Sequence, residues 1–228
     1  MSAQPESLQS KSSDSRPLIA IVDYGIGNLH SAHKAFEHLG ANVRLTADKA
    51  LIDKAAGVVL PGVGAFRPCM TALRHTKLDT AILDAIDSGC PFLGICIGMQ
   101  VLFAESDEAP GIKGLSIFPQ KVRWLSDSVK KPQMQWNILQ PEYDHPMFAG
   151  LDQQPWMYFV HSLAPEQSKD VIAVCDYGGS VVAAVARDNV WAVQFHPEKS
   201  STAGLRILDN FTTAVKKTSR TINSHKTP

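Results

Sequence analysis

The 228-residue chain has no long hydrophobic run and no excess charge of either sign. No apolar stretch approaches the roughly 20 residues that a membrane-spanning helix needs, and the N-terminus lacks the apolar segment of a secretory signal. Basic and acidic residues number 22 each, and no basic run is longer than the pair Lys216-Lys217. Such a balance does not favour binding to nucleic acid or to an anionic membrane. We therefore expect a cytoplasmic protein with neither of these partners.

Cysteine is also scarce, because the chain has only four. None of them belongs to a Cys-x-x-Cys pair or a histidine cluster, so the sequence predicts neither a disulfide framework nor a zinc site. We expect no metal and no organic cofactor. Free cysteines are most often buried core residues, and we interpret Cys69, Cys90 and Cys175 in this way. The fourth, Cys96, has a different setting.

Cys96 stands between Gly94 and Gly98, where the apolar run 91–95 gives way to the segment 98–103. This pattern is typical of a nucleophile elbow, in which a strand, a sharp turn and a helix present one reactive side chain. The turn strains its central residue, and glycines two positions before and after it prevent a collision. The first turn of the helix would favour a thiolate and offer the Ile97 N–H as an oxyanion donor.

A thiol nucleophile needs a base, and residues 194–200 (Gln-Phe-His-Pro-Glu-Lys-Ser) supply one. Pro197 favours an extended backbone at His196, so we expect the side chains of His196 and Glu198 to point to the same side. Histidine can accept the thiol proton near neutral pH, and a neighbouring carboxylate stabilises the imidazolium. His-Pro-Glu alone is a weak signal. Together with the cysteine elbow it predicts a triad of Cys96, His196 and Glu198.

The order of apolar segments indicates the fold class. In the first half, strand-like and amphipathic segments alternate, at 18–22, 29–39, 57–60, 78–88 and 91–95. This alternation predicts an α/β fold with an open, mostly parallel sheet flanked by helices. We expect the strand-like segments of the second half to add antiparallel strands to the sheet before a closing helix over 201–215; they are 122–125, 171–174, 181–186 and 190–195.

The two ends of the chain have a different composition. Residues 1–16 and 216–228 contain too little apolar surface to offset the entropy lost on ordering. We expect a disordered N-terminal tail, one domain over 17–215, and a flexible C-terminal tail.

A glycine-rich loop, Pro61-Gly62-Val63-Gly64, follows the strand-like run that ends at Leu60. Ligands of open α/β sheets bind at this carboxyl edge, where glycines let backbone N–H groups approach a substrate. An ordinary turn between a strand and a helix could show the same residues, and spacing alone does not separate the two. A phosphate-binding loop is disfavoured, because no Gly-Lys-Ser/Thr ending follows.

Two blocks, Gly-Ile-Cys-Ile-Gly-Met-Gln at 94–100 and Phe-His-Pro-Glu at 195–198, resemble the signatures of the class I (triad) glutamine amidotransferases. Those enzymes hydrolyse the side-chain amide of glutamine and deliver ammonia to a partner. Four further blocks, at 23–28, 61–66, 158–162 and 194–200, are most similar to the branch that serves histidine biosynthesis. The resemblance extends from about residue 18 to residue 211 and implies the class I amidotransferase fold. It also implies a heterodimer with a (β/α)₈ cyclase that uses the ammonia.

The resemblance gives roles to residues that the sequence alone leaves open. It implies that the second oxyanion donor is a backbone N–H near Val63, next to Gly62. Gln100, otherwise an ordinary helix residue, and Glu108, otherwise a surface acid, match substrate-binding positions of the family. The segment that contacts the substrate through backbone groups matches His161 and Ser162.

The chain departs from the family pattern in two places. Leu163 stands where the family usually has an aromatic residue. The family reads His-Met-Gly-Trp-Asn where this chain has Gln-Met-Gln-Trp-Asn at 133–137. That segment faces the cyclase near the ammonia entrance, which implies a docking or gating role for Gln133, Gln135, Trp136 and Asn137. Glutamine in place of glycine disfavours a positive φ and adds bulk, so we expect this surface or gate to differ from the usual one.

Three classes of function remain open on the sequence. The leading one is a glutaminase subunit that passes ammonia to a cyclase, or to another synthase. A free-standing cysteine hydrolase of the same fold, such as a γ-glutamyl hydrolase or a peptidase, would need the same triad. A catalytically silent binding subunit is disfavoured by the intact triad. Gln100 and the block at 158–162 favour glutamine over a peptide as the substrate.

Overall fold

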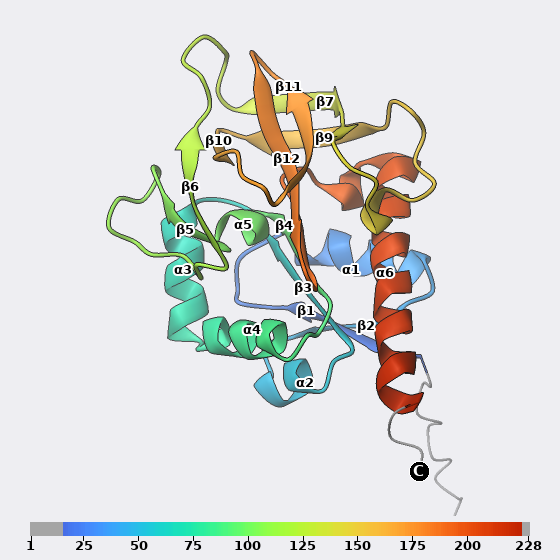
Figure 1. Cartoon of the computed structure of the whole chain (residues 1–228). Helices are drawn as coiled ribbons and strands as arrows, with labels where there is room; N and C mark the ends of the chain where they lie inside the picture. Colours follow the sequence, from blue (N-terminus) through green and yellow to red (C-terminus); the bar gives the residue numbers. More distant parts are fainter. Residues whose placement is uncertain (1–15, 225–228) are drawn as a thin grey trace, which may run out of the picture.

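The computed structural model describes residues 16–224 (Figure 1). The elements in chain order are β1 (Leu18–Val22), α1 (Leu29–His38), β2 (Asn42–Thr46), α2 (Lys49–Asp53), β3 (Gly57–Gly62), α3 (Phe66–His75), α4 (Leu78–Asp87), β4 (Phe92–Cys96), α5 (Ile97–Gln100), β5 (Phe103–Ser106), β6 (Phe118–Trp124), β7 (Gln133–Ile138), β8 (Gln140–Pro141), the 3₁₀ turn η1 (Pro146–Phe148), β9 (Trp156–His161), β10 (Leu163–Pro165), β11 (Val171–Asp176), β12 (Ser180–Arg187), β13 (Val190–Val193), the 3₁₀ turn η2 (Pro197–Lys199) and α6 (Ser201–Ser224). Each predicted strand and helix is present, most with shifted ends, whereas β2, α2, α3, β5 and β7 to β10 were not predicted.

An eight-stranded sheet forms the centre, in the order β2-β1-β3-β4-β13-β12-β11-β8. The first five strands are parallel, and β12, β11 and β8 extend the sheet through antiparallel pairs. This confirms the predicted α/β fold. Because β4 and β13 are parallel neighbours, the residues that follow them emerge at the same carboxyl edge. The topology thereby brings Cys96 and His196 together.

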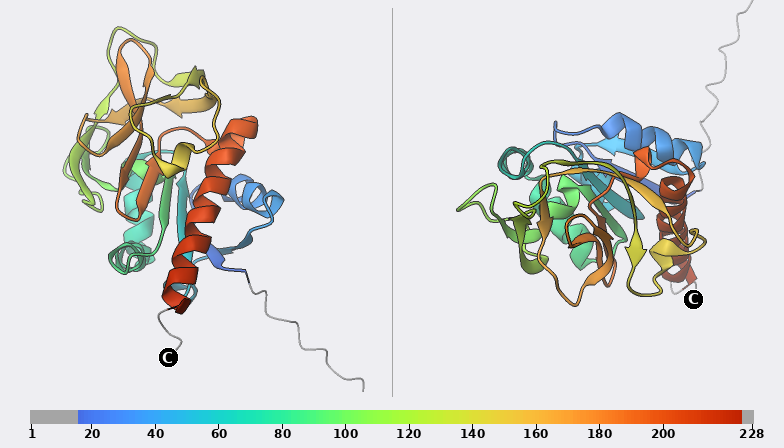
Figure 2. Two further views of the ribbon diagram at one scale, coloured as in Figure 1. Left: turned by 45° about the vertical axis from the view of Figure 1, so that its right-hand side comes forward. Right: turned by 90° about the horizontal axis from the view of Figure 1, so that it is seen from above.

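Helices cover both faces of this sheet. Figure 2 shows α1 and α6 on one side and α3 and α4 on the other. Every residue of β3 and β4 is buried, as expected for parallel strands covered on both faces. The apolar stripe of α1 faces α6, where the rings of Phe36 and Phe211 pack edge-on with centroids 6.3 Å apart. The carboxyl edge remains free to hold a site.

Two smaller sheets lie next to the central one. β10, β6 and β5 form a three-stranded sheet, and β7 and β9 form an antiparallel pair. The prediction that segment 122–125 joins the central sheet is therefore wrong. Segment 190–195 does join it, but as β13, which runs parallel to β4 and antiparallel only to β12. Apolar alternation identifies a strand without identifying its neighbour.

The ends of the domain differ from the prediction at one boundary. Helix α6 continues to Ser224, so the predicted helix end at Val215 is too early. Val215 is the last buried apolar residue over 201–219, the part of the helix whose side chains are described, so the periodic signal weakens there. Beyond it, the Thr218 and Ser219 hydroxyls donate to the carbonyls of Ala214 and Val215, one turn earlier.

The predicted N-terminal tail lies outside the described residues, except Arg16, whose carbonyl accepts a hydrogen bond from Asn42 at 3.0 Å. Residues 225–228 also lie outside them. Over residues 16–224, no helix has the length and apolar character needed to cross a membrane.

Candidate active site

Cys96 is the last residue of β4 and stands at a strained turn. Its φ of 56° and ψ of −112° are values that residues with a side chain rarely adopt. Helix α5 begins at the next residue, Ile97. The strand, turn and helix predicted around Cys96 are therefore present.

Gly94 and Gly98 leave the space that this turn needs. A Cβ at Gly94 would lie 2.7 Å from the Gly98 carbonyl oxygen, and a Cβ at Gly98 would lie 1.8 Å from the Leu60 carbonyl oxygen. Both neighbours are backbone atoms of the packed core, which cannot move aside cheaply. The elbow therefore tolerates no side chain at either position.

Helix α5 has only four residues and is shorter than the predicted helix over 98–103. The N–H groups of Leu115 and Phe118 donate to the carbonyls of Val101 and Leu102, and the chain continues into β5. A single turn has a small dipole, so the helix favours a thiolate less than the sequence predicted.

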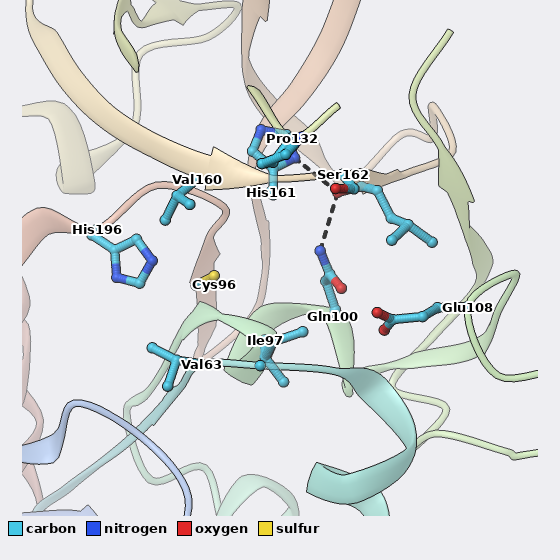
Figure 3. A pocket seen from close by; sticks show the side chains of 12 residues that line it. Val63, Cys96, Ile97, Gln100, Glu108, Pro132, Val160, His161, Ser162 and His196 are labelled. Carbon is cyan, nitrogen blue, oxygen red and sulfur yellow. Dashed lines mark hydrogen bonds between the residues drawn. The ribbon is translucent and has the colours of Figure 1, made fainter. Parts of the chain in front are cut away.

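His196 reaches the cysteine from the neighbouring strand, and Figure 3 shows its ring beside the Cys96 sulfur. Ring Nδ1 lies 2.8 Å from Glu198 Oε1, whereas the buried Nε2 has no hydrogen-bond partner. The prediction of an extended segment through Glu198 is wrong, because residues 197–199 form the 3₁₀ turn η2. This turn nevertheless places the Glu198 carboxylate against the His196 ring.

Ser200, for which the sequence predicted no role, fixes the backbone of His196. Its hydroxyl donates to the His196 carbonyl at 2.6 Å and accepts the Tyr158 N–H at 2.9 Å. The Tyr158 carbonyl in turn accepts the His196 N–H at 3.0 Å. Ser200 is fully buried, so this clamp ties β9 to the histidine. The only sequence signal for it was its place in the block 194–200.

The charge of His196 follows from its two neighbours. Burial opposes the charged imidazolium, but the Cys96 sulfur and the Glu198 carboxylate outweigh it and raise the pKa of His196 to about 10. Such surroundings favour the charged imidazolium beside the sulfur. His196 then carries a proton next to the Cys96 sulfur.

These residues open into a pocket of about 260 Å³. Figure 3 shows Cys96 and His196 on one side of it, and Gln100 and Glu108 on the other. The predicted site residues that line it are Val63, Cys96, Ile97, Gln100, Glu108, His161, Ser162 and His196. Of the remaining predicted residues, Glu198 lies behind His196, and Gly62 ends β3 just before the loop.

The carboxamide of Gln100 is buried and held by two acceptors. Its Nε2 donates to the Leu163 carbonyl at 3.1 Å and to Gln194 Oε1 at 2.9 Å. Its buried Oε1 accepts no hydrogen bond from any of residues 16–224. This oxygen is therefore the atom of Gln100 that still lacks a donor.

His161 and Leu163 complete this wall through one carbonyl. His161 Nδ1 lies 2.8 Å from the Leu163 carbonyl oxygen, which requires a proton on Nδ1. Burial lowers the pKa of His161 to about 4, so the ring is neutral at pH 7. The carbonyl of Ser162 accepts the Leu125 N–H at 2.9 Å. Because Leu163 serves the site through its backbone, its departure from an aromatic residue leaves these hydrogen bonds intact.

Glu108 links the pocket to helix α3. Its Oε2 accepts the N–H of Phe66, the first residue of that helix, at 2.7 Å. A carboxylate is favoured at this end of a helix. Within residues 16–224, Oε1 has no hydrogen-bond partner, so it can receive a cationic group in the pocket.

The two predicted oxyanion donors do not both point into the pocket. Val58 donates to the Pro91 carbonyl at 2.8 Å, and this parallel register continues to the pair of Gly62 and Cys96. In that phase the Gly62 carbonyl is directed at the Ile97 N–H. A trans peptide has its N–H and C=O on opposite sides, so the Val63 N–H is directed away. Both donors become available only if the peptide between Gly62 and Val63 rotates.

Residues 133–137 lie in β7, and their side chains differ in exposure. Gln133 is fully buried and donates to the Cys175 sulfur at 3.8 Å, so its side chain does not belong to an exposed docking surface. Gln135 is exposed in a regular strand opposite Phe159, where no positive φ is required. Asn137 donates to the Asp176 carbonyl at 2.8 Å and joins β7 to β11.

One side of the β7–β9 pair is apolar and uncovered. The strand register places six residues on it, which we call the apolar face: Met134, Trp136, Ile138, Trp156, Tyr158 and Val160. Met134 is 62% exposed, Trp136 44% and Trp156 51%. Val160 also lines the pocket, so the apolar face begins at the pocket rim. Contiguous exposed apolar surface of this kind marks an interaction site.

The described residues show no group of three or more histidine, cysteine or acidic side chains arranged to hold a metal ion.

Comparison with known proteins places this geometry in a family. Residues 20–215 match the family model described as "Glutamine amidotransferase class-I". A protein of Salinibacter ruber named "Imidazole glycerol phosphate synthase subunit HisH" is 47% identical over 203 residues, which cover 85% of this chain and 93% of that one. A protein of Synechococcus elongatus with the same name is 49% identical over 207 residues, 88% of this chain and 95% of the relative.

Solved structures agree at the level of fold. The structure titled "Structure of PurLQS from Thermotoga maritima" contains a chain that superposes with a TM-score of 0.72 at 20% identity. The match covers 88% of this chain and all of the other. At this identity the similarity concerns the architecture alone.

Proposed function

The chain belongs to the class I glutamine amidotransferase family, and we propose that it is the glutaminase subunit of an imidazole glycerol phosphate synthase. The observation that carries this proposal is the meeting of Cys96, His196 and Glu198 at one edge of the sheet, beside an amino-acid-sized pocket. Relatives of that name, similar over nearly their whole length, support the finer assignment. The reaction is hydrolysis of glutamine to glutamate and ammonia.

The first half-reaction forms a thioester. The Cys96 thiolate attacks the side-chain amide carbon of glutamine, and the carbonyl oxygen becomes a tetrahedral oxyanion. As the C–N bond breaks, the His196 imidazolium gives its Nε2 proton to the departing nitrogen, which leaves as ammonia. Glu198 holds the ring through Nδ1 during this transfer. The product is a glutamyl group on the sulfur.

The second half-reaction releases glutamate. Neutral His196 now takes a proton from water, and the resulting hydroxide attacks the thioester carbon. Collapse of the second oxyanion breaks the C–S bond and restores the thiolate and the imidazolium. Both oxyanions need the N–H groups of Ile97 and Val63, which is why rotation of the peptide before Val63 would control the rate.

Substrate orientation follows from the layout of the pocket. A glutamine with its amide at Cys96 places its amino group near Glu108, whose Oε1 has no partner within residues 16–224, and an N–H toward Oε1 of Gln100, which also lacks a donor there. The wall formed by residues 161–163 contributes backbone groups. Such placement of both ends of the substrate lowers the entropic cost of attack.

The Glu198→Gln variant should be slower than the wild type by roughly 10²-fold and should show a shifted pH profile. The amide oxygen can still hold the ring, but the negative charge that helps raise the pKa of His196 is lost. The pKa of His196 falls, and the alkaline limb of the profile moves to lower pH because the proton donor is lost earlier. The His196→Ala variant should lose more activity than Glu198→Gln. Equal and negligible losses in both variants, measured as kcat/KM against pH, would show that another pair does this work.

The partner that we propose is a (β/α)₈ cyclase, docked on the apolar face in a heterodimer. The exposed rings of Trp136 and Trp156 supply the anchors that stable interfaces use. Val160 belongs to both the apolar face and the pocket, so ammonia formed at Cys96 has a short path into the covering subunit. A free-standing hydrolase would have no use for such a face. Glutamate formation with and without the cyclase tests the proposal.

We also propose a cytoplasmic location, since a thiolate nucleophile requires a reducing compartment.

A further inference from the structure

The side chain of Gln194 lies between Cys96 and Gln100 and contacts both. Gln194 is fully buried just after β13 and two residues before His196. Its Nε2 lies 3.9 Å from the Cys96 sulfur, and its Oε1 accepts from Gln100 Nε2 at 2.9 Å. In the sequence, Gln194 belongs to the block 194–200 without a role of its own.

The hydrogen bonds of Gln100 determine which end of the Gln194 amide faces the Cys96 sulfur. The Leu163 carbonyl can only accept, so Gln100 must present its nitrogen to it at 3.1 Å. The same nitrogen then requires an acceptor on Gln194, which Oε1 provides. Gln194 must therefore direct its NH₂ group at Cys96. The reverse orientation would place two amide nitrogens together and a carbonyl oxygen against the sulfur.

We propose that Gln194 stabilises the Cys96 thiolate by donating a hydrogen bond to its sulfur, with Gln100 holding the amide in the orientation that this requires. A donor to an ionised acceptor in a buried site is stronger than a bond between neutral groups. Because the amide is uncharged and cannot ionise, it favours the thiolate without competing for the proton that His196 must deliver. The same amide pair couples the nucleophile to a residue that lines the substrate pocket.

The ionisable side chains around the Cys96 sulfur are those of His196, Tyr24, Cys69 and Glu108. His196, held by Glu198, faces Cys96 from the η2 side. From the β1 and α3 sides come Tyr24 and Cys69, and burial raises the pKa of both, that of Cys69 to about 11. Those two are neutral at pH 7. Across the pocket, Glu108 is occupied at one oxygen by the Phe66 N–H.

Two near-isosteric variants of the full-length chain test the proposal. Gln194→Met removes both hydrogen bonds, whereas Gln194→Glu keeps the acceptor for Gln100 and replaces only the donor. The measurement is the rate at which iodoacetamide alkylates Cys96, followed by mass spectrometry of its peptide across pH. We expect the pH of half-maximal rate to rise by about one unit in Gln194→Met, a roughly tenfold loss of thiolate, as for one hydrogen bond to a charged group. In Gln194→Glu this pH should rise further, because the carboxylate repels the thiolate.

Gln133→Met is the matched control. Gln133 is equally buried and donates to a cysteine sulfur at 3.8 Å, but that sulfur belongs to Cys175. We expect a similar loss of melting temperature and no change in the alkylation profile of Cys96. A Gln100→Met variant should give a smaller rise than Gln194→Met, since the amide of Gln194 remains but loses its orienting partner.

The inference rests on the proposed role of Cys96 as nucleophile, and the assay separates the two. An unreactive Cys96 in the wild type, with no glutamate formed, would overturn the proposed function. A reactive wild-type Cys96 whose profile is unchanged in both Gln194 variants would overturn only the inference, even if those variants lost activity. If the alkylation profile of Cys96 shifted equally in Gln133→Met, the effect would come from core packing, and the inference would be overturned as well. If Gln194→Met does not fold, Gln194→Glu alone decides.

Discussion

The Cys96→Ala variant is expected to form no glutamate from glutamine, while its complex with the cyclase still makes product from added ammonium salts. Only the production of ammonia depends on the sulfur, because the proposed partner would consume ammonia at its own site. The substitution removes one buried atom at the elbow and adds none, so the fold and the apolar face should persist. Glutamate release and ammonium-dependent product formation are measured in parallel on the same complex.

A matched control for this experiment is Cys90→Ala, which removes a half-buried thiol that donates to the carbonyls of Ala55 and Pro91. It should retain both activities. Substantial glutamine-dependent activity in Cys96→Ala would exclude Cys96 as the nucleophile. Loss of the ammonium-dependent reaction as well would mean that the substitution had damaged the complex instead.

The second large effect is stimulation by the partner. The isolated chain should turn over glutamine slowly, because the Gly62 carbonyl is directed at the Ile97 N–H and the Val63 N–H points away. Docking of the proposed cyclase, loaded with its own substrate as ligand, should raise the rate by roughly 10²-fold or more, which needs about 3 kcal/mol of differential stabilisation. A partner can supply it only by binding the rotated-peptide state more tightly than the observed one. Glutamate formation is measured for the chain alone, with cyclase, and with cyclase and ligand.

The segment 133–137 offers a sharper form of this test. Gln135 is exposed in β7, next to the apolar face, and we expect Gln135→Gly to change the stimulation factor more than the basal rate. Full activity of the isolated chain, unaffected by any cyclase, would contradict the coupling and favour a free-standing hydrolase. An equal change of both rates would place Gln135 in the chemistry and not in the coupling.

The sequence was sufficient for features that depend on local rules. Gly94 and Gly98 reveal the elbow because any side chain there meets backbone, and that collision is a property of the turn itself. The apolar alternation gave the α/β class for the same reason: buried strands and amphipathic helices have different periods. The helix end at Val215 was misplaced because residues 216–219 of the helix are not buried and so carry no such period.

Features that depend on distant contacts could not be predicted in this way. Gln133 and Gln194 are glutamines that a sequence places at the surface, yet both are fully buried because a sulfur and an amide satisfy them. The direction of the Gly62 carbonyl depends on the register between β3 and β4, which no single segment specifies. The 3₁₀ turn at Glu198 depends on the clamp that Ser200 makes with Tyr158.

The most direct test of the account is the covalent intermediate. The chain, in complex with the cyclase, is given isotopically labelled glutamine, quenched in acid during turnover and digested for mass spectrometry. We predict a labelled glutamyl group on Cys96, located by fragmentation of its peptide, and none on Cys69, Cys90 or Cys175. Rapid glutamate formation with the label on another residue, or with no bound label at any quench time, would contradict the thioester at Cys96.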